Sequence, residues 1–125
     1  MSHETILLID DETAIAEGLA AYLDDGERTI VVCSDIESAE ILVENLEFSS
    51  IVSDIRLSGP FRHEGLDFVG HALTEQPGCR VILMTGVHSE ELREEASRRG
   101  AAAFLEKPFD SIDLERLLQG GSRAA

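Results

Sequence analysis

The amino-acid sequence predicts an α/β protein in which five βα units build one parallel sheet. Three observations support this prediction. Five short apolar runs lack polar alternation, which is typical of strands buried on both faces. The first residues of these runs lie 24, 21, 30 and 20 positions apart, so every gap has room for a helix. Apolar residues recur at helical spacing within the gaps, and right-handed crossovers then place helices on both faces of the sheet.

The predicted strands are the apolar runs at residues 6–9, 30–33, 51–52, 81–84 and 101–105. Each run is short enough for a strand and too short for a helix of ordinary length. Glycine or proline stands where the chain returns from a helix to the next strand, at Gly26, Pro77, Gly78 and Gly100. These breaks separate the strands from the helices that precede them.

The predicted helices follow the strands in order, and each has an apolar stripe. The stripes are Ile15, Leu19, Tyr22 and Leu23; Ile36, Ala39, Val43 and Leu46; Leu66, Val69 and Leu73; Leu92 and Ala96; and Leu114, Leu117 and Leu118. The fourth helix is the most polar, and its charged face is either solvated or a docking site. Asp110 is the predicted N-cap of the fifth helix.

The length of 125 residues fits a single domain over residues 1–125, with a core at about 4–119 and a short tail. A chain of this size removes roughly two-thirds of its surface from water on folding, so it needs no disulfide. Cys33 and Cys79 are predicted to be buried free thiols, because nothing in the sequence indicates an oxidising compartment.

The charge balance limits the partners of the domain. Twenty-five Asp and Glu face ten Lys and Arg, for a formal net charge of −15. Such an excess repels phosphate backbones and anionic lipids, so we expect no direct binding to nucleic acid or membranes. No apolar run approaches the roughly 20 residues of a bilayer span, and the first residues lack a secretory signal. The sequence therefore predicts a cytoplasmic protein.

Charged and hydroxyl side chains follow the predicted strands. They are Asp10, Asp11 and Glu12 after the first, Asp54 after the third, Thr85 after the fourth and Lys107 after the fifth. The carboxyl ends of parallel strands meet at one edge of the sheet, where ligands of such folds bind. Lys107 is the only lysine in the chain. Its compact positive charge is thus predicted to act at the same edge of the sheet, beside the carboxylates.

Carboxylates gathered at one edge of the sheet repel one another, and a bound cation would offset this repulsion. At ~4 Å and an effective dielectric near 20, each pair repels by about 4 kcal/mol. Mg²⁺ suits the site because it binds one or two carboxylates and keeps positions for water and phosphate oxygens. Asp54 is then a candidate nucleophile toward phosphorus, since carboxylates form aspartyl phosphates. Lys107 and Thr85 are candidates to stabilise the phosphoryl oxygens.

These residues together resemble a response-regulator receiver domain of bacterial two-component signalling. The resemblance covers roughly residues 4–118. It rests on the triplet Asp10-Asp11-Glu12, on Asp54-Ile55-Arg56-Leu57, on Thr85-Gly86 and on Lys107-Pro108-Phe109. It implies a flavodoxin-like (βα)5 three-layer sandwich, with a parallel five-stranded sheet in the order 2-1-3-4-5. In that order Cys33 ends the second strand and Cys79 begins the fourth, so the two cysteines lie at opposite ends of the parallel strands, too far apart for a disulfide.

The resemblance also implies roles for the site residues. Asp54 would accept a phosphoryl group from a phosphohistidine of a sensor kinase or a phosphotransfer protein. The implied Mg²⁺ ligands are Asp11, Asp54 and the main-chain carbonyl of Arg56, with Asp10 acting largely through water. Thr85 and Lys107 would contact the phosphoryl group, and the peptide bond before Pro108 would be cis. Such a domain catalyses its own phosphorylation and dephosphorylation and turns over no metabolite.

The implied switch involves Thr85 and Phe104. After phosphorylation Thr85 would move toward the new anion, and Phe104 would turn inward to fill the vacated space. The surface of the fourth helix, fifth strand and fifth helix would then change and regulate a downstream protein or an output domain. In receivers this surface often makes partner or dimer contacts, so a homodimer is one outcome. Phe104 lacks the hydroxyl of a tyrosine, so it offers no hydrogen bond to a partner.

The segment from Ser58 to Glu64 departs from the family pattern, because it is about three residues longer than the usual turn. Two interpretations stay open. The first is length variation without consequence, which surface loops tolerate. The second is that Phe61 and Arg62 influence the choice of partner beside the site.

Three other functions compete with the receiver. One is an interaction module that kept the fold and lost phosphorylation; the intact Asp54 and Lys107 argue against it. A flavodoxin-like electron carrier would need a phosphate-binding loop after the first strand, where Asp10 and Asp11 repel anions. A haloacid-dehalogenase-type phosphatase would need a second aspartate two residues after Asp10, where Glu12 stands. The four histidines show no metal-ligand spacing and receive no role.

Overall fold

The computed structural model describes residues 3–55 and 64–120, which form five strands and five helices in strict alternation. In chain order they are β1 (Glu4–Ile9), α1 (Thr13–Leu23), β2 (Arg28–Cys33), α2 (Ile36–Asn45), β3 (Ser50–Asp54), α3 (Glu64–Glu75), β4 (Arg80–Thr85), α4 (Glu90–Arg98), β5 (Ala103–Glu106) and α5 (Ser111–Gly120). Each predicted apolar run lies in or overlaps one of these strands.

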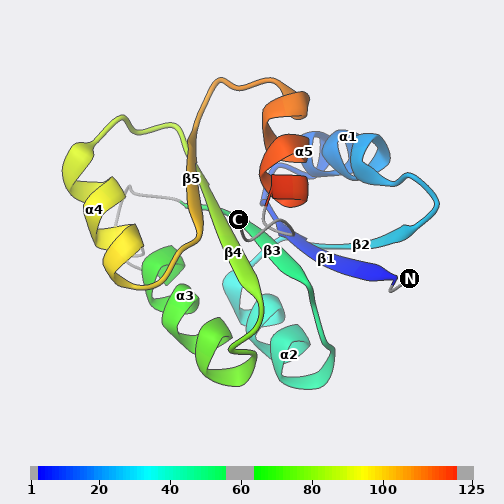
Figure 1. Cartoon of the computed structure of the whole chain (residues 1–125), viewed down its shortest axis with the longest axis horizontal. Helices are drawn as coiled ribbons and strands as arrows, with labels where there is room; N and C mark the ends of the chain where they lie inside the picture. Colours follow the sequence, from blue (N-terminus) through cyan, green and yellow to red (C-terminus); the bar gives the residue numbers. More distant parts are fainter. Residues whose placement is uncertain (1–2, 56–63, 121–125) are drawn as a thin grey trace.

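The strands form one parallel sheet in the order β2-β1-β3-β4-β5, as Figure 1 shows. The register pairs Ile9 of β1 with Cys33 of β2 and with Ser53 of β3. Asp54 of β3 lies opposite Met84 of β4. The predicted α/β class and strand order are confirmed. Because β1 and β3 are neighbours while the chain passes through β2 between them, their carboxyl ends form the point where the strand order reverses.

Two hydrophobic cores hold the three layers together. Helices α2, α3 and α4 cover one face of the sheet, and their core includes Leu7, Ile51, Phe68 and Leu83. Helices α1 and α5 cover the other face, over Leu8, Val52, Met84 and Leu114. Adjacent residues of one strand thus contribute to different cores, as the pleat requires. The central strands are buried on both faces, which explains their unbroken apolar runs.

The buried faces of α1 and α2 differ from the predicted stripes. Ile15 is 48% exposed and Tyr22 is 50% exposed, whereas Ala16 is fully buried with Leu19 and Leu23. The prediction weighted large side chains, but α1 packs closely enough on the sheet that the small Ala16 faces it. Leu46 lies one residue beyond the end of α2 and is also exposed. The stripes predicted for α3 and α5 do face the cores.

Helix α5 begins directly after Asp110, the predicted N-cap. The Asp110 amide donates a hydrogen bond of 3.2 Å to the carboxylate of Asp113, three residues later. This is the reciprocal half of a capping box, and it satisfies an amide at the start of the helix. The helix thus begins where Asp110 predicted it to begin, and the Asp113 carboxylate, which the prediction did not include, helps to fix its start.

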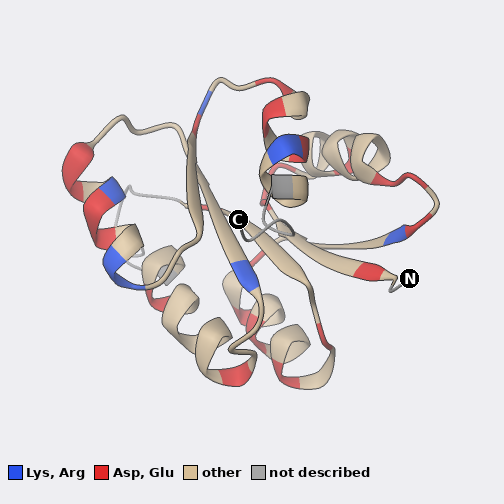
Figure 2. Cartoon of the chain, in the orientation of Figure 1, with Lys and Arg blue, Asp and Glu red and all other residues tan. Residues whose placement is uncertain are grey.

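Both cysteines are free, Cys79 is buried and Cys33 is half-buried, so the prediction of two buried thiols holds fully only for Cys79. Among the helices in residues 3–55 and 64–120, none has both the length and the apolar character needed to cross a membrane. Figure 2 shows Asp and Glu on all sides of the molecule and only scattered Lys and Arg. The acidic residues are thus spread over the fold and are not confined to one element.

Candidate functional site

Three aspartates meet at the carboxyl ends of β1 and β3. Asp10 and Asp11 follow β1, and Asp54 is the last residue of β3. One carboxylate oxygen from each residue lies within 4.8 Å of the other two. The two strands are direct neighbours in the sheet, so the fold itself forces these charges together. The predicted acidic cluster therefore exists as a local arrangement.

Asp10 is the most buried member, with 2% of its surface exposed. Its Oδ1 accepts a hydrogen bond of 2.9 Å from the Glu12 amide. Its Oδ2 is buried and has no hydrogen-bond partner within the described part of the chain. An unpartnered buried carboxylate oxygen is costly, and a bound cation would remove the cost. With hard oxygen ligands and repelling charges, the cluster fits a divalent ion such as Mg²⁺.

Asp54 faces the lone lysine across the sheet edge. Lys107 Nζ lies 3.1 Å from Asp54 Oδ1, and the Asp54 side chain is only 12% exposed. Burial raises the pKa of Asp54, the hydrogen bond and charge of Lys107 lower it, and the charges of Asp10 and Asp11 raise it again. The net direction is upward. Asp54 is thus a desolvated carboxylate with an ammonium on one oxygen, in a crowded negative environment.

Thr85 and Lys107 belong to one connected edge. Thr85 ends β4 and is fully buried, and its Oγ1 accepts a hydrogen bond of 3.1 Å from the Val87 amide. The Lys107 amide donates a 2.7 Å hydrogen bond to the Thr85 carbonyl. The bond between Lys107 and Pro108 is cis, as the resemblance implied. The backbone therefore fixes Lys107 directly beside the end of β4.

Two further predicted positions have different outcomes. Arg56, with its carbonyl, lies outside the described residues, as do residues 58–63 of the extended segment. Phe104 on β5 is partly buried against the core under α4. The Arg93 guanidinium of α4 stacks on its ring, 5.0 Å from the ring centre. The candidate switch residue is thus already in contact with α4.

Sequence reasoning missed a set of side chains beside Lys107. His88 Nε2 lies 3.0 Å from the Lys107 carbonyl oxygen, and His88 Nδ1 lies 3.4 Å from Glu106 Oε1. Arg93 Nη2 lies 3.4 Å from Glu106 Oε2. These residues come from the β4–α4 connection, from β5 and from α4. No spacing in the sequence signals such a contact, because it depends on how α4 docks on the sheet.

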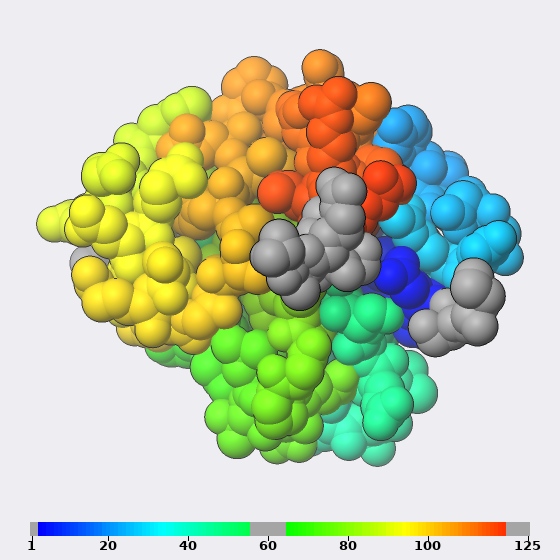
Figure 3. Space-filling model, viewed as in Figure 1, coloured from blue at the N-terminus to red at the C-terminus, as the bar shows by residue number. Residues whose placement is uncertain are grey.

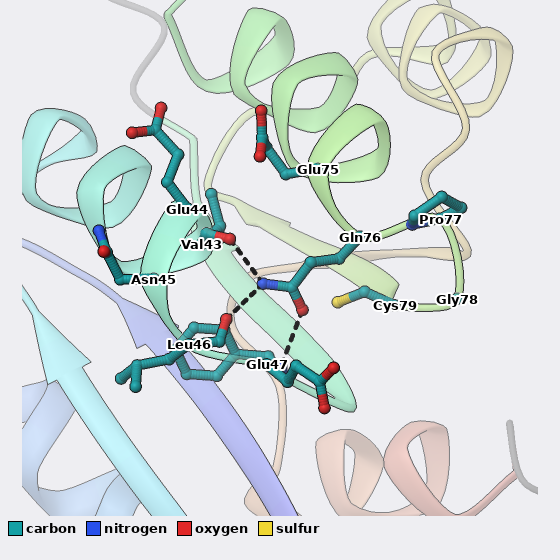
Figure 4. Close-up of a pocket in the computed structure, with 11 residues that line it drawn as sticks. Val43, Glu44, Asn45, Leu46, Glu47, Glu75, Gln76, Pro77, Gly78 and Cys79 are labelled. Atoms are coloured by element: carbon teal, nitrogen blue, oxygen red, sulfur yellow. Dashed lines mark hydrogen bonds between the residues drawn. The ribbon is translucent and has the colours of Figure 1, made fainter.

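A cavity of about 460 Å³ lies at the opposite end of the sheet, between the segments that lead into β3 and β4 (Figure 4). Gln76 crosses it. Its amide nitrogen donates to the carbonyls of Val43 and Leu46, and its oxygen accepts from the Phe48 amide. These bonds satisfy backbone groups where α2 ends. Gln76 therefore has a structural role, and the aspartate cluster is the candidate functional site.

The family model for the response regulator receiver domain matches residues 6–119. The chain belongs to this family. The match covers every strand and helix except the first two residues of β1 and the last residue of α5. The prediction made from the resemblance is thereby confirmed, including the flavodoxin-like fold. The chain is a receiver domain of the two-component response regulators, a family of phosphorylation-dependent switches.

Curated relatives show the same relationship. The transcriptional regulatory protein FixJ of Bradyrhizobium diazoefficiens is 29% identical over 96% of this chain and 57% of its own length. The transcriptional regulatory protein ComA of Bacillus subtilis is 33% identical over 82% of this chain and 48% of its length. The chain thus spans about half the length of these relatives.

Solved structures share the fold. A CheY-like response regulator receiver domain protein from Methanospirillum hungatei covers 99% of this chain with a TM-score of 0.84 and 26% identity, and all of that chain is matched. A response regulator from Burkholderia pseudomallei has a TM-score of 0.82 at 24% identity, covering 97% of this chain and 69% of its own. That structure holds a phosphorylated aspartic acid and a calcium ion.

Proposed function

We propose that this receiver accepts a phosphoryl group on Asp54 from a phosphohistidine of a sensor kinase or a phosphotransfer protein. The observation that carries the proposal is the Asp54 carboxylate, which lies within the aspartate cluster and touches the single lysine at 3.1 Å. A carboxylate held between an ammonium and a candidate cation site is arranged for attack on phosphorus. The Burkholderia response regulator, which shares this fold, supports the proposed chemistry, since its structure holds a phosphorylated aspartic acid.

The reaction would proceed by transfer between two nucleophiles. An Asp54 carboxylate oxygen forms a bond to phosphorus, while the phosphorus–nitrogen bond of the phosphohistidine breaks. The histidine nitrogen keeps the electron pair and takes up a proton. Lys107 Nζ, now on Asp54 Oδ1, is close enough to pair with an incoming phosphoryl oxygen. The buried Thr85 would supply its hydroxyl to the phosphoryl group from the end of β4.

We assign the cation site to Asp10, Asp11, Asp54 and the main-chain carbonyl of Arg56. Mg²⁺ bound there would neutralise phosphoryl oxygens during transfer. The unpartnered Oδ2 of Asp10 supports a cation at this place, directly or through water. Asp10 and Asp11 hold the ion site at β1, and Asp54 joins it from β3. The same three carboxylates explain why the ion is needed before another anion can approach.

The output would come from the surface of α4, β5 and α5. Thr85 would shift toward the phosphoryl group and Phe104 would turn inward, which changes the packing of α4. The relatives FixJ and ComA are transcriptional regulatory proteins, which supports an output step in transcription. We propose an output domain, a separate protein or a second copy as the partner of this surface, and the cytoplasm as the location of the protein.

Labelling by acetyl phosphate tests the proposal. We expect the protein to become phosphorylated in the presence of Mg²⁺, to lose labelling with a chelator, and to lose it in Asp54→Asn. The matched control is Asp67→Asn, because Asp67 is an exposed aspartate on α3 that pairs with Arg99. It should label like the original protein. Labelling that persists in Asp54→Asn would place the acceptor elsewhere.

The second candidate function is an interaction module without phosphorylation. It predicts no labelling of the folded protein under any divalent ion. The cluster of Asp10, Asp11 and Asp54, with Lys107 on Asp54, argues against it, because gathering these carboxylates is costly and serves no purpose without the chemistry. The same experiment therefore separates the two functions.

A further inference from the structure

The interface between α4 and β5 carries charged contacts that the phosphoryl chemistry does not use. Phe104 and Glu106 are two residues apart on β5, so they share one face of the strand. Arg93 of α4 reaches both. Its guanidinium lies 5.0 Å from the Phe104 ring centre, and its Nη2 lies 3.4 Å from Glu106 Oε2. One arginine thus ties the candidate switch ring to the end of β5.

His88 extends these contacts to the phosphorylation site. Its Nδ1 lies 3.4 Å from Glu106 Oε1, and its Nε2 lies 3.0 Å from the carbonyl oxygen of Lys107. Both partners of the ring are hydrogen-bond acceptors, so only the imidazolium form of His88 donates to Glu106 and to Lys107 at once. In that form the Glu106 carboxylate is shared between the β4–α4 connection and helix α4. A continuous path runs from Arg93 through Glu106 and His88 to the residue whose ammonium touches Asp54.

The same interface is loosely filled. A cavity of about 190 Å³ lies between α4 and β5, lined by Arg93, Ala96, Ser97, Ala101, Ala102, Ala103 and Phe104. Figures 1 and 3 show α4 beside β5 at the outer edge of the sheet, away from the central strands. Ala96 of α4 is buried in the core, and the cavity lies beside it where the lining side chains are small. Such an interface has room for a second packing.

We infer that Glu106, held by Arg93 and His88, is a latch that keeps α4 and Phe104 in the unphosphorylated arrangement. The inference rests on the proposed function, because it concerns the regulation of that site. Phe104 cannot turn inward and keep the Arg93 guanidinium on its ring. The latch contacts therefore favour the resting packing, and their loss shifts the population toward the activated one. Glu106 and Arg93 are positioning residues, since neither touches the reacting atoms.

Titration with beryllium fluoride, a phosphoryl mimic, tests the latch at saturating Mg²⁺. Binding is followed by the amide NMR signals of α4 and β5. In Arg93→Ala and in Glu106→Gln we expect the half-saturating concentration to fall about three- to fivefold, the size that partly exposed ion pairs allow. A residue with a merely structural role would raise this concentration or leave it unchanged, so the direction of the effect is the decisive readout.

The matched control is Arg98→Ala, which removes an arginine of α4 that pairs with Glu95 of the same helix. It should bind like the original protein. Arg93→Lys keeps a charge near Glu106 but loses the planar stacking on Phe104, so we expect an intermediate concentration. Glu106→Gln preserves the side-chain volume and serves if Arg93→Ala fails to fold.

Unchanged or weaker binding in both Arg93→Ala and Glu106→Gln would overturn the latch. The parallel titration of the original protein and of Asp54→Asn distinguishes this from a failure of the proposed function. If the original protein does not bind beryllium fluoride, or if Asp54→Asn binds it equally well, the phosphorylation site itself is wrong. If the original protein binds beryllium fluoride normally and Arg93→Ala and Glu106→Gln bind it no more tightly, only the latch is rejected.

Discussion

The Asp54 carboxylate is stabilised by one neighbour and destabilised by its surroundings. Burial raises its pKa, Lys107 lowers it, and Asp10 and Asp11 raise it, with a net upward direction. The folded protein therefore binds the Asp54 proton more tightly than the unfolded chain does. Stability falls as the pH rises from the ordinary value of 3.8 through the raised folded value. At neutral pH the ionised carboxylate is a net cost to folding.

We accordingly predict that Asp54→Asn stabilises the protein at pH 7 without divalent ions. The expected gain in the free energy of unfolding is about 1 kcal/mol, a size common for single substitutions. Urea unfolding at pH 7 measures it. The gain should shrink toward about pH 3, where Asp54 of the original protein is itself protonated. If the Asp54→Asn variant instead unfolds at lower urea than the original protein, the contact with Lys107 outweighs the cost of burial.

Among the elements, the turn from α4 into β5 depends on one glycine. Gly100 has a φ of +105°, and a Cβ placed on it would lie 2.6 Å from Leu73 Cδ1 of α3. The leucine methyl can move, but an L side chain at this φ remains strained. We predict that Gly100→Ala lowers the free energy of unfolding by about 2 kcal/mol.

Gly18 is the matched control for this prediction, because it lies within α1 and its Cβ position has nothing within 4 Å. Gly18→Ala should raise the stability by about 0.5–1 kcal/mol through helix propensity. Thermal unfolding of the two variants side by side gives opposite shifts. If both substitutions shifted the melting temperature in the same direction, the positive φ of residue 100 would not be the cause of the effect of Gly100→Ala.

Helix α5 is anchored by a partly buried ion pair. Arg28 of β2 donates two hydrogen bonds to Glu115, at 2.8 and 2.9 Å, and a third to the Leu23 carbonyl at 3.2 Å. The hydrogen bond from Arg28 is the largest influence lowering the pKa of Glu115. The pair therefore contributes stability above the ordinary value of 4.5, and this contribution is lost as the pH falls through the depressed folded value.

From this sign we predict that Glu115→Gln destabilises the protein by about 2 kcal/mol at pH 7, less than breaking a fully buried pair. The difference from the original protein should shrink as the pH falls below 4.5. Unfolding curves at about pH 7, 5 and 3.5 measure it. Glu95→Gln is the control, because Glu95 pairs with Arg99 and Arg98 on the surface of α4. Equal effects of the two substitutions would contradict an anchoring role for Glu115.

The sequence predicted the elements better than their faces. Unbroken apolar runs mark strands buried on both sides, so β1, β3 and β4 were evident. On α1 the prediction was correct for Leu19 and Leu23 but wrong for Ile15 and Tyr22, because large side chains do not reveal that Ala16 approaches the sheet. The parallel sheet followed from the alternation of elements. Its strand order required the family resemblance, since periodicity does not encode which strands pair.

The part of the candidate site that lies at the carboxyl ends of the strands was predictable from the sequence. Asp10, Asp11, Asp54 and Lys107 follow strands, so a parallel sheet brings them to one edge whatever the details of packing. The contacts of His88 and Arg93 with Glu106 were not predictable, because they depend on the docking of α4. That docking is set by side-chain packing in three dimensions, which the periodicity of the sequence does not encode. Strand-end chemistry made Asp54 a candidate nucleophile and Lys107 and Thr85 its partners, whereas the phosphohistidine donor, the Arg56 carbonyl ligand and the Phe104 switch came from the resemblance alone.

For the whole molecule, the net charge of −15 opposes the compact state. Salt screens this repulsion, so we expect the melting temperature to rise as NaCl increases from about 10 to about 150 mM. The effect is general, because Asp and Glu occur on all sides of the molecule (Figure 2). A divalent ion would screen in the same way, so its stabilisation alone does not establish a site.

The last prediction separates screening from binding. At matched ionic strength, about 5 mM Mg²⁺ should raise the melting temperature beyond the effect of NaCl, because an ion that binds only the folded state stabilises it. Asp11→Asn should lose this additional rise, whereas Asp67→Asn, on the surface of α3, should keep it. Differential scanning calorimetry measures all three proteins. If Asp11→Asn keeps the additional rise, Mg²⁺ acts through the overall charge of the molecule, and the cluster at β1 and β3 is not its site.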